Sequence, residues 1–498
     1  MEKKAIVIGS GFAGLSAATH LAEAGFEVTV LEKNEGPGGR ARRFETAGFT
    51  FDMGPSWYWM PDVFEQYFEH FGRKVSDYYE LDRLDPSYRV YFGKGDFVDL
   101  SAQLEDLYAL FDRLEPGSSA ELKSFLDDAA YKYEVGINDL VRKPGRSLLE
   151  FADWRVAKGV VQLQLFSSIR KVIHKKFANP KLRSLLEFPV LFLGAMPKDT
   201  PALYSLMNYA DMVGGTWYPK GGMYEIVRAM VKLAEEKGVK FEYDKEVTRI
   251  AIHKGMANRV YTIEQAYDAD VVIAGADYHH VEQNLLPPEG RMYSEKYWDN
   301  RKMAPSSLLF YLGVDKPLDG LLHHTLFFDE SLDAHGKEIY EDPKWPTKPL
   351  FYVSCVSKTD PLSAPEGMEN VFILIPTAPG LKEEEDTREH YLNIVLDRLE
   401  EHTGQKIREH IVYQRSYAHR DFIEDYHAYK GNAYGLANTL DQTAILKPAM
   451  KSKKVKNLYF TGQLTTPGPG VPPSLISGQV AAGEAMKDYK IALDETFV

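Results

Sequence analysis

The fold of this protein is decided by residues 4–32, which read KAIVIGSGFAGLSAATHLAEAGFEVTVLE. Residues 5–8 are apolar and mainly β-branched, which is typical of a strand buried on both faces. Residues 13–24 carry apolar side chains with the period of a helix, and Gly25 is the expected C′ residue. Residues 27–31 are expected to form a second strand. The stretch therefore predicts a βαβ unit with parallel strands.

A glycine motif connects the first strand to the helix. Gly9, Gly11 and Gly14 have the spacing G-x-G-x-x-G, which gives a tight turn, close approach to a pyrophosphate and close packing of helix on strand. The free N–H groups and positive dipole end of the helix place the phosphates at residues 11–13. Glu32 ends the second strand, where an acid would accept hydrogen bonds from the ribose hydroxyls. These features predict a bound dinucleotide without a 2′-phosphate.

A second glycine motif, Gly38-Gly39-Arg40, follows the acid that ends the second strand. Glycines at this point would let a loop fold back over the pyrophosphate, and Arg40 could add a charge-assisted hydrogen bond. This arrangement favours a flavin over a nicotinamide cofactor. A plain glycine turn with a solvated arginine is the alternative.

The C-terminal segment contains another candidate cofactor contact. Residues 457–462 are expected to form a strand that runs into Gly462, followed by a rigid loop at residues 467–473 with the sequence PGPGVPP. A helix is expected to open at Ser474, a good N-cap. Such a helix start would aim N–H groups at reduced flavin, which carries negative charge near N1 and C2=O. A proline-rich surface loop is the alternative.

Composition limits the other functions. The chain has 498 residues, enough for two or three domains, and its net charge of −13 disfavours binding to nucleic acid. Cys355 is the only cysteine, so neither an internal disulfide nor a cysteine-based metal site is expected. His279 and His280 are adjacent, their side chains diverge, and no metal site is predicted. Since no run of eighteen apolar residues occurs, we expect a cytoplasmic protein without a transmembrane helix.

The chain leaves the nucleotide-binding unit and returns to it. We expect residues 1–60, 220–280 and 451–498 to form a Rossmann-like FAD-binding domain. Residues 61–219 and 281–450 are expected to form an interleaved, discontinuous substrate-binding domain. The fold class is therefore α/β for the first domain and α+β overall.

Two further stretches have more than one interpretation. The aromatic cluster WYWM at residues 57–60 belongs either to the core or to the wall of a flavin or substrate site. Residues 155–183 contain eight Lys or Arg, interleaved with apolar residues, and no Asp or Glu. This pattern suits an anionic membrane surface, so residues of about 150–195 are expected to face a membrane peripherally. An amphipathic helix with a solvated basic face is the alternative.

A set of local motifs, in this order along nearly the whole chain, resembles the bacterial carotenoid desaturases. The motifs are Gly39-Arg40-Ala41, residues 49–55 (FTFDMGP), residues 60–63 (MPDV), residues 115–118 (EPGS), residues 220–223 (KGGM) and residues 467–472 (PGPGVP). The family includes phytoene, dehydrosqualene and hydroxycarotenoid 3,4-desaturases. No motif in this set separates these three substrates.

The resemblance implies a function, a cofactor and its contacts. It implies FAD, a long hydrophobic tunnel, and stepwise dehydrogenation of a long acyclic carotenoid by hydride transfer to the flavin, with oxygen or a quinone as electron acceptor. Overall similarity alone favours a 1-hydroxycarotenoid 3,4-desaturase over a phytoene desaturase. No residue is identified as the catalytic base. The expected cofactor-binding residues are Gly9, Gly11, Phe12, Ala13, Gly14, Glu32, Lys33, Gly39, Arg40, Gly54, Pro55, Val247, Gly462, Gly470, Val471 and Pro472.

Two rival functions use the same fold. A flavin amine oxidase would need a polar, aromatic-caged pocket suited to an amine, whereas a desaturase needs a long apolar tunnel. A non-enzymatic lipid escort, like the Rab guanine-nucleotide dissociation inhibitors, would have no need of the flavin-facing loop at residues 468–473.

Overall fold

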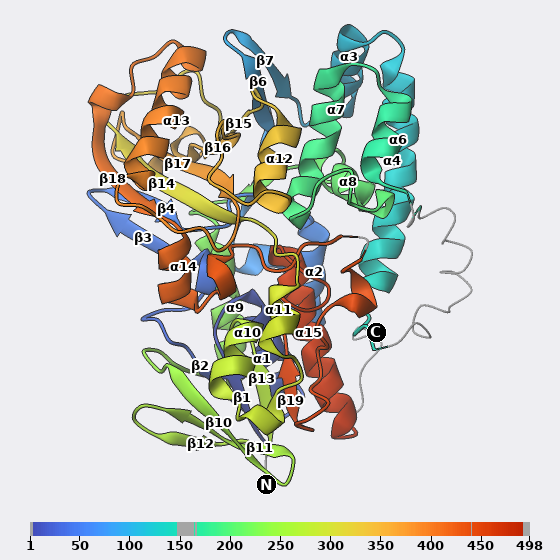
Figure 1. The fold of residues 1–498 in the computed structure, drawn as a ribbon, viewed down its shortest axis with the longest axis vertical. Helices are drawn as coiled ribbons and strands as arrows, with labels where there is room; N and C mark the ends of the chain where they lie inside the picture. Colours follow the sequence, from blue (N-terminus) through green and yellow to red (C-terminus); the bar gives the residue numbers. More distant parts are fainter. Residues whose placement is uncertain (1–2, 147–163, 165–166, 440, 492–498) are drawn as a thin grey trace.

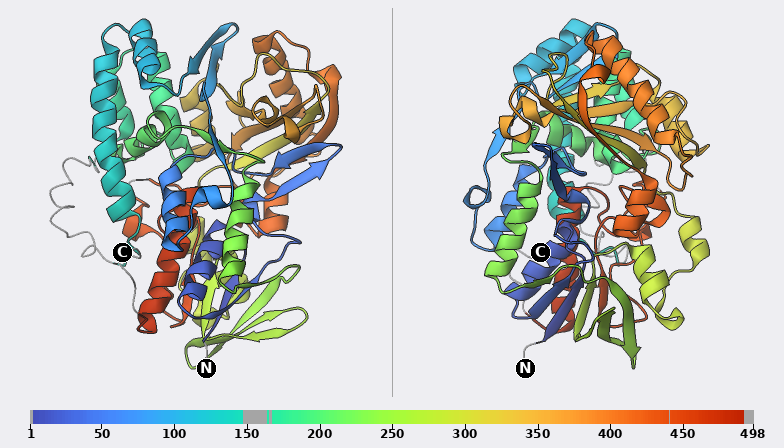
Figure 2. Two further views of the ribbon diagram at one scale, coloured as in Figure 1. Left: turned by 180° about the vertical axis from the view of Figure 1, so that it is seen from behind. Right: turned by 90° about the vertical axis from the view of Figure 1, so that its left-hand side faces the viewer.

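The computed structural model describes residues 3–146, 164, 167–439 and 441–491 (Figure 1). The parallel sheet and its helices lie in the lower half of the molecule, and a larger sheet lies in the upper half (Figure 2). Of the basic stretch at residues 155–183, residues 155–163 and 165–166 lie outside the described residues. None of the described helices combines the length and the apolar character needed to cross a membrane.

A five-stranded parallel sheet is built around the predicted βαβ unit. Its strands, in the order β19-β13-β1-β2-β9, are β19 (Leu458–Phe460), β13 (Val271–Ala274), β1 (Lys4–Ile8), β2 (Glu27–Leu31) and β9 (Lys240–Glu242). The helix of the unit is α1 (Phe12–Glu23), and the φ of +85° at Gly25 confirms its expected place after the helix. The strands come from the three ranges assigned above to the FAD-binding domain. This supports the proposed division of the chain into two interleaved domains.

The central strand of this sheet is apolar on both faces because both faces are covered. Ala5 and Val7 pack with α1, α9 (Tyr224–Glu236) and α15 (Val471–Asp488). Ile6 and Ile8 pack toward a small antiparallel sheet. That sheet consists of β10 (Val247–His253), β11 (Met256–Thr262) and β12 (Ala266–Asp268).

The start of α15 differs from the prediction. The helix begins at Val471 with Gly470 as its N-cap, so Ser474 lies inside the first turn. Pro472 and Pro473, interpreted from sequence as part of the loop, occupy the first turn instead. Proline is tolerated there because the first N–H groups of a helix have no intrahelical partner.

A seven-stranded sheet forms the upper half. Its order is β18-β14-β17-β16-β15-β6-β7, with β18 (Ile411–Tyr417), β14 (Ser306–Val314), β17 (Glu369–Thr377), β16 (Phe351–Ser354), β15 (His324–Phe327), β6 (Tyr88–Gly93) and β7 (Asp96–Leu100). All neighbours are antiparallel except β15 and β6. The β15–β6 pair joins the two ranges of the expected substrate-binding domain.

The two faces of this sheet have different environments. Leu308, Phe310 and Leu312 of β14 pack against α13 (Thr387–Thr403), which covers the outer face. Because side chains alternate along a strand, Ser307 and Leu309 point to the opposite, inner face. The inner face is turned toward the interior of the protein, where the candidate site lies.

Shorter elements complete the fold. The remaining strands are β3 (Arg43–Thr46), β4 (Phe49–Asp52), β5 (Leu81–Arg83) and β8 (Trp217–Pro219). The remaining α-helices among the described residues are α2 (Pro61–His70), α3 (Leu104–Leu114), α4 (Ser118–Val135), α6 (Ile169–Lys176), α7 (Pro180–Glu187), α8 (Leu206–Met212), α10 (Tyr278–His280), α11 (Glu295–Asp299), α12 (Leu332–Tyr340) and α14 (His419–Tyr426).

Candidate active site

A cavity of about 440 Å³ extends from the carboxyl ends of β1 and β2 to the inner face of the seven-stranded sheet. Ligands of open α/β sheets bind at this edge of the parallel strands. The cavity has two parts with different linings. We call the part beside Gly9, Glu32 and Arg40 the nucleotide half, and the part beside Leu309 and Leu374 the apolar half.

The glycine turn has the close packing that the spacing predicts. A Cβ atom added at Gly14 would lie 2.0 Å from the carbonyl oxygen of Gly9, so only glycine permits α1 to pack this tightly on β1. At Gly11 a Cβ would meet no atom within 4 Å, and this residue lines the cavity. The turn therefore offers open space and the first N–H groups of α1 to an anion.

Glu32 directly follows β2 and has its carboxylate at the cavity wall, where the residue is only 5% exposed. Its Oε2 accepts hydrogen bonds from the backbone N–H of Ser10 (2.9 Å) and its hydroxyl (2.6 Å). Its Oε1 accepts bonds from the backbone and side-chain nitrogens of Asn34, each at 2.9 Å. Since a carboxylate accepts about four hydrogen bonds, a bound ribose would replace one of these side-chain donors.

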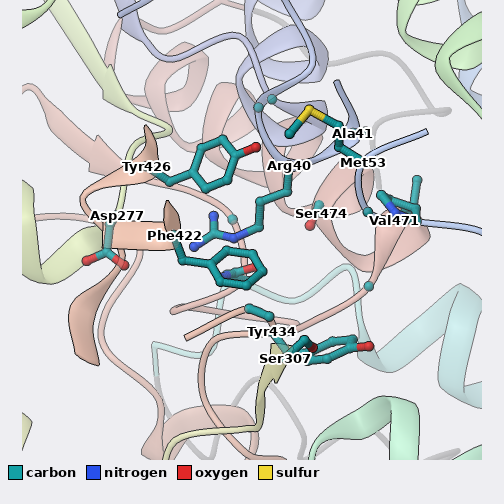
Figure 3. Close-up of a pocket in the computed structure, with 18 of the residues that line it drawn as sticks. Arg40, Ala41, Met53, Asp277, Ser307, Phe422, Tyr426, Tyr434, Val471 and Ser474 are labelled. Atoms are coloured by element: carbon teal, nitrogen blue, oxygen red, sulfur yellow. The ribbon is translucent and has the colours of Figure 1, made fainter. Parts of the chain in front are cut away.

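Arg40 is a cation in the wall of the cavity (Figure 3), and its guanidinium points between Tyr426 and Phe422. Burial lowers the pKa of Arg40, and the nearby charge of Asp277 opposes this shift. The only hydrogen bond of the guanidinium to a described residue runs from Nη2 to the carbonyl oxygen of Asn432 at 3.3 Å, while Nε has none. A buried guanidinium with free donors fits an anionic group such as a diphosphate.

The C-terminal loop brings a helix start to the cavity. Gly470 and Val471 line it, together with Ser474 in the first turn of α15. Gly470 has a φ of +114°, a conformation that L side chains rarely adopt. The N-terminal end of α15 therefore places a positive dipole end against the cavity, as predicted for a flavin contact.

Fourteen of the sixteen predicted cofactor residues line the cavity. They are Gly9, Gly11, Phe12, Ala13, Glu32, Lys33, Gly39, Arg40, Gly54, Pro55, Val247, Gly462, Gly470 and Val471. Gly14 and Pro472 do not line it: the first packs behind the glycine turn and the second lies in the first turn of α15. Trp57 also lines the cavity, whereas Tyr58, Trp59 and Met60 lie in the core. The aromatic cluster at residues 57–60 therefore contributes one residue to the cavity wall and three to the core.

Several residues of the nucleotide half were missed by the sequence analysis. Asp277 accepts hydrogen bonds from the backbone N–H groups of Tyr429 (3.1 Å) and His280 (3.2 Å). Burial raises its pKa, and Arg40 opposes the shift. Its position just after the parallel strand β13 was a signal that could have indicated it. Tyr426, which comes from α14 far along the chain, had no such signal.

The two adjacent histidines have separate partners. The Nε2 of His279 lies 2.9 Å from a carboxylate oxygen of Glu295. The ring of His280 lines the cavity and stacks on the ring of His427, with 3.9 Å between ring centroids. Burial and the neighbouring His427 lower the pKa of His280 to about 3, so the stacked ring is neutral near pH 7.

The apolar half has a lining of a different kind. The inner face of the seven-stranded sheet contributes Leu309, Leu326 and Leu374, and the region after α7 contributes Phe188 and Leu191. All carboxylates among the described lining residues lie in the nucleotide half: Glu32, Glu246, Asp277 and Asp425. The cavity thus combines an anion-binding part with a part suited to hydrocarbon.

Comparison with known proteins identifies similar sequences. The family model described as flavin-containing amine oxidoreductase matches residues 12–486. A carotenoid 3,4-desaturase of Haloarcula japonica is 42% identical over 487 residues, covering 97% of this chain and 98% of the relative. A zeta-carotene-forming phytoene desaturase of Myxococcus xanthus is 32% identical, covering 97% and 94%.

The fold is also found among solved structures. The structure of cyclohexylamine oxidase from Brevibacterium oxydans has a TM-score of 0.60 with 14% sequence identity, covering 98% of this chain and all of that one. This likeness concerns the fold alone.

Proposed function

Since this chain belongs to the family of flavin-containing amine oxidoreductases, we propose that it is a FAD-dependent desaturase that introduces double bonds into an acyclic carotenoid. The observation that carries the proposal is the division of the cavity into a nucleotide half and an apolar half. The relatives named above support it, because both are carotenoid desaturases matched over nearly their full length. The greater identity to the 3,4-desaturase favours 3,4-desaturation of a hydroxylated carotenoid.

The proposed contacts of FAD follow the lining of the nucleotide half. We infer that Glu32 binds the ribose of the adenosine, and that Arg40 and the N–H groups at residues 11–13 bind the diphosphate. The N-terminal end of α15 at Val471 would face the pyrimidine edge of the flavin. The Nε of Arg40, which lacks a hydrogen-bond partner among the described residues, supports this assignment.

The residues of the apolar half would act by positioning the substrate. When bound, FAD supplies the acceptor for the hydride that leaves the carotenoid. A wall of Leu309, Leu326 and Leu374 excludes water and aligns the chain, which is the contribution expected where the developing cation is delocalised along a polyene. His335 also lines this half, but its ring nitrogens contact Pro376 O (2.9 Å) and Leu350 N (3.0 Å), so it is not a free base.

The rival functions fit the cavity less well. A cationic amine in the apolar half would meet no carboxylate among the described lining residues, and the desolvated charge would have no partner there. A lipid escort would not need a buried Arg40 with a free Nε. The desaturase proposal uses both halves of the cavity.

Product analysis tests the proposal. The FAD-loaded protein is incubated with phytoene, dehydrosqualene and a 1-hydroxylated acyclic carotenoid, with oxygen or a quinone as electron acceptor. We expect a longer conjugated system in the hydroxylated carotenoid, seen as a red shift of its absorbance. Conversion of phytoene alone would contradict 3,4-desaturation. Reduction of the flavin by an amine but by no carotenoid would favour the amine oxidase, and no reaction at all would favour the escort.

Replacing Glu32 with alanine is expected to weaken FAD binding by about 1–3 kcal/mol, because charged hydrogen bonds to the ribose would be lost. Titration of the apoprotein with FAD, followed by flavin fluorescence, measures this. Glu35→Ala is the matched control, since it removes the same charge from an exposed residue nearby. Equal FAD affinity of Glu32→Ala and the control would place the ribose elsewhere.

We also propose that the described part of the basic stretch contacts an anionic membrane. The structure narrows the residues involved. Arg170 pairs with Glu187 (2.9 Å) and Asp333 (2.7 Å), so it has a structural partner on each side. Lys171 and Lys175 of α6 are exposed and form no ion pair with any described residue. These two lysines are therefore the proposed contacts.

The double variant Lys171→Gln/Lys175→Gln is expected to bind anionic liposomes about 2 kcal/mol more weakly at low salt, at about 1 kcal/mol per lysine. Wild-type binding should weaken as salt screens the attraction. Sedimentation with liposomes measures both effects. The control Lys453→Gln/Lys454→Gln changes the same charge beside β19, at the opposite end of the molecule from α6 (Figure 1). An equal loss of liposome binding in both double variants would show that α6 is not the membrane contact.

A further inference from the structure

Three hydroxyl groups without a hydrogen-bond partner elsewhere in the described protein lie in the mainly apolar half of the cavity. They belong to Ser307 on β14, Tyr340 at the end of α12 and Tyr434 in the loop after α14. Ser307 and Tyr434 are neighbours and lie on the side of Phe422 away from Asp277 (Figure 3). We call these three residues the hydroxyl cluster.

The hydroxyl cluster is poorly satisfied by the protein itself. Ser307 is 2% exposed, and its Oγ has no hydrogen-bond partner of normal geometry among the described residues. Burial raises the pKa of Tyr434 to about 12, and the neighbouring Ser307 hydroxyl opposes the shift. Burial also raises the pKa of Tyr340, with Tyr434 as the next cause, and both phenols line the cavity. No hydrogen bond links the Tyr340 hydroxyl to a described residue.

Tyr352 provides a contrast on the same wall. Its side chain comes from β16 and lines the cavity, but its hydroxyl lies 2.6 Å from the Nδ1 of His324. A tyrosine in this wall can therefore have a protein partner. The Ser307 and Tyr434 hydroxyls contact each other, but no hydrogen bond links the hydroxyl cluster to a described residue outside it, although it faces the same space.

On the premise of the proposed function, we propose that the hydroxyl cluster binds a hydroxyl group carried by the carotenoid substrate. A serine and two phenols can both donate to and accept from an aliphatic hydroxyl. A hydrocarbon chain would offer these hydroxyls no hydrogen bond, and each polar group left unsatisfied costs about 1–3 kcal/mol. A site built in this way discriminates against a substrate that lacks the hydroxyl.

The position of the cluster orients the substrate. Ser307 and Leu309 share the inner face of β14, two residues and about 7 Å apart. Ser307 and Tyr434 line the same cavity as Val471 and Ser474 at the start of α15 (Figure 3). A carotenoid held by its hydroxyl here would present its hydroxylated end toward the nucleotide half, with the rest of the chain along the apolar lining.

The test compares a 1-hydroxylated acyclic carotenoid with the parent hydrocarbon of the same length. The variants are Ser307→Ala, Tyr434→Phe and the double variant Ser307→Ala/Tyr434→Phe, each checked for FAD content. We expect the ratio of kcat/KM for the hydroxylated substrate over the hydrocarbon to fall at least tenfold in the double variant, mainly through a higher KM for the hydroxylated one. Ser307→Thr, which keeps a hydroxyl, should retain most of the wild-type ratio.

Tyr352→Phe is the matched control, because it removes a phenol that already has His324 as its partner. It should change both substrates by a similar factor and leave the ratio unaltered. An unchanged ratio in Ser307→Ala/Tyr434→Phe would show that the cluster holds water rather than substrate and would overturn the proposal. If the wild type converts neither carotenoid, the proposed function fails separately. In that case the binding affinity of each carotenoid is measured by quenching of tryptophan fluorescence. The ratio of the two affinities in the wild type and the double variant then tests the inference.

Discussion

Alanine in place of Gly14 is expected to yield a protein that unfolds at a lower temperature and binds no FAD. The added Cβ would lie 2.0 Å from the carbonyl oxygen and 3.1 Å from the carbonyl carbon of Gly9, which are backbone atoms that cannot rotate away. Helix α1 would have to move off β1, and overpacking of this kind costs about 1–3 kcal/mol or more. The same movement would displace the N–H groups proposed to bind the diphosphate.

Gly11→Ala is the matched control for this prediction. Gly11 has a φ of −70°, which alanine adopts readily, and its added Cβ would meet no atom within 4 Å. Because Gly11 lines the cavity, the methyl group would obstruct the diphosphate without disturbing the apoprotein. Thermal unfolding of both apoproteins and the ratio of flavin to protein separate the two effects. Normal apoprotein stability in Gly14→Ala would contradict the packing argument.

Arg40→Met is expected to weaken FAD binding by about 2–5 kcal/mol, the usual range for truncating one partner of a buried charge pair. The apoprotein should nevertheless be as stable as the wild type or more stable. Arg40 forms no ion pair within 4 Å with a described residue, and desolvation outweighs the attraction of the more distant Asp277. Removing this charge should therefore relieve more desolvation cost than it loses in attraction. A substitution that weakens FAD binding but does not destabilise the apoprotein indicates that the replaced cation serves to bind the cofactor.

Arg42→Met should behave differently and serves as the control. Burial acts to lower the pKa of Arg42, but Tyr426 and Asp425 outweigh it and raise the pKa, in keeping with the ion pair to Asp425. Loss of this pair should destabilise the apoprotein. Calorimetric FAD titration and apoprotein denaturation by urea test both variants. An apoprotein of Arg40→Met that is less stable than the wild type would assign Arg40 a structural role instead.

Local sequence patterns predicted the parts of the fold that depend on neighbouring residues. The βαβ unit was predicted from strand composition, helix period and the glycine at position 25, because each of these acts over a few residues. The start of α15 was misplaced because proline is common both in loops and in the first turn of a helix. Only the observed backbone decides between these two roles.

The basic stretch shows that long-range ion pairs cannot be predicted from the sequence. Its charge pattern was evident, but the acidic partners of Arg170 come from α7 and from the start of α12. The partner of Lys176 comes from α4, fifty-five residues earlier in the chain. The charges within a segment do not reveal its ion pairs with residues that are far away in the sequence. Within the described part of the stretch, Lys171 and Lys175 of α6 are therefore the proposed membrane contacts.

The sequence by itself determined the glycine turn and the acid of the nucleotide half, since Gly9, Gly11 and Glu32 act through one short βαβ unit whose geometry is set locally. It also indicated the family, through motifs in a fixed order. Only the tertiary structure decided the apolar half and its hydroxyl cluster. Ser307 and Tyr434 are separated by more than a hundred residues and by several elements. They meet because the seven-stranded sheet turns one face of β14 inward and the chain after α14 returns beside it, which no local pattern specifies.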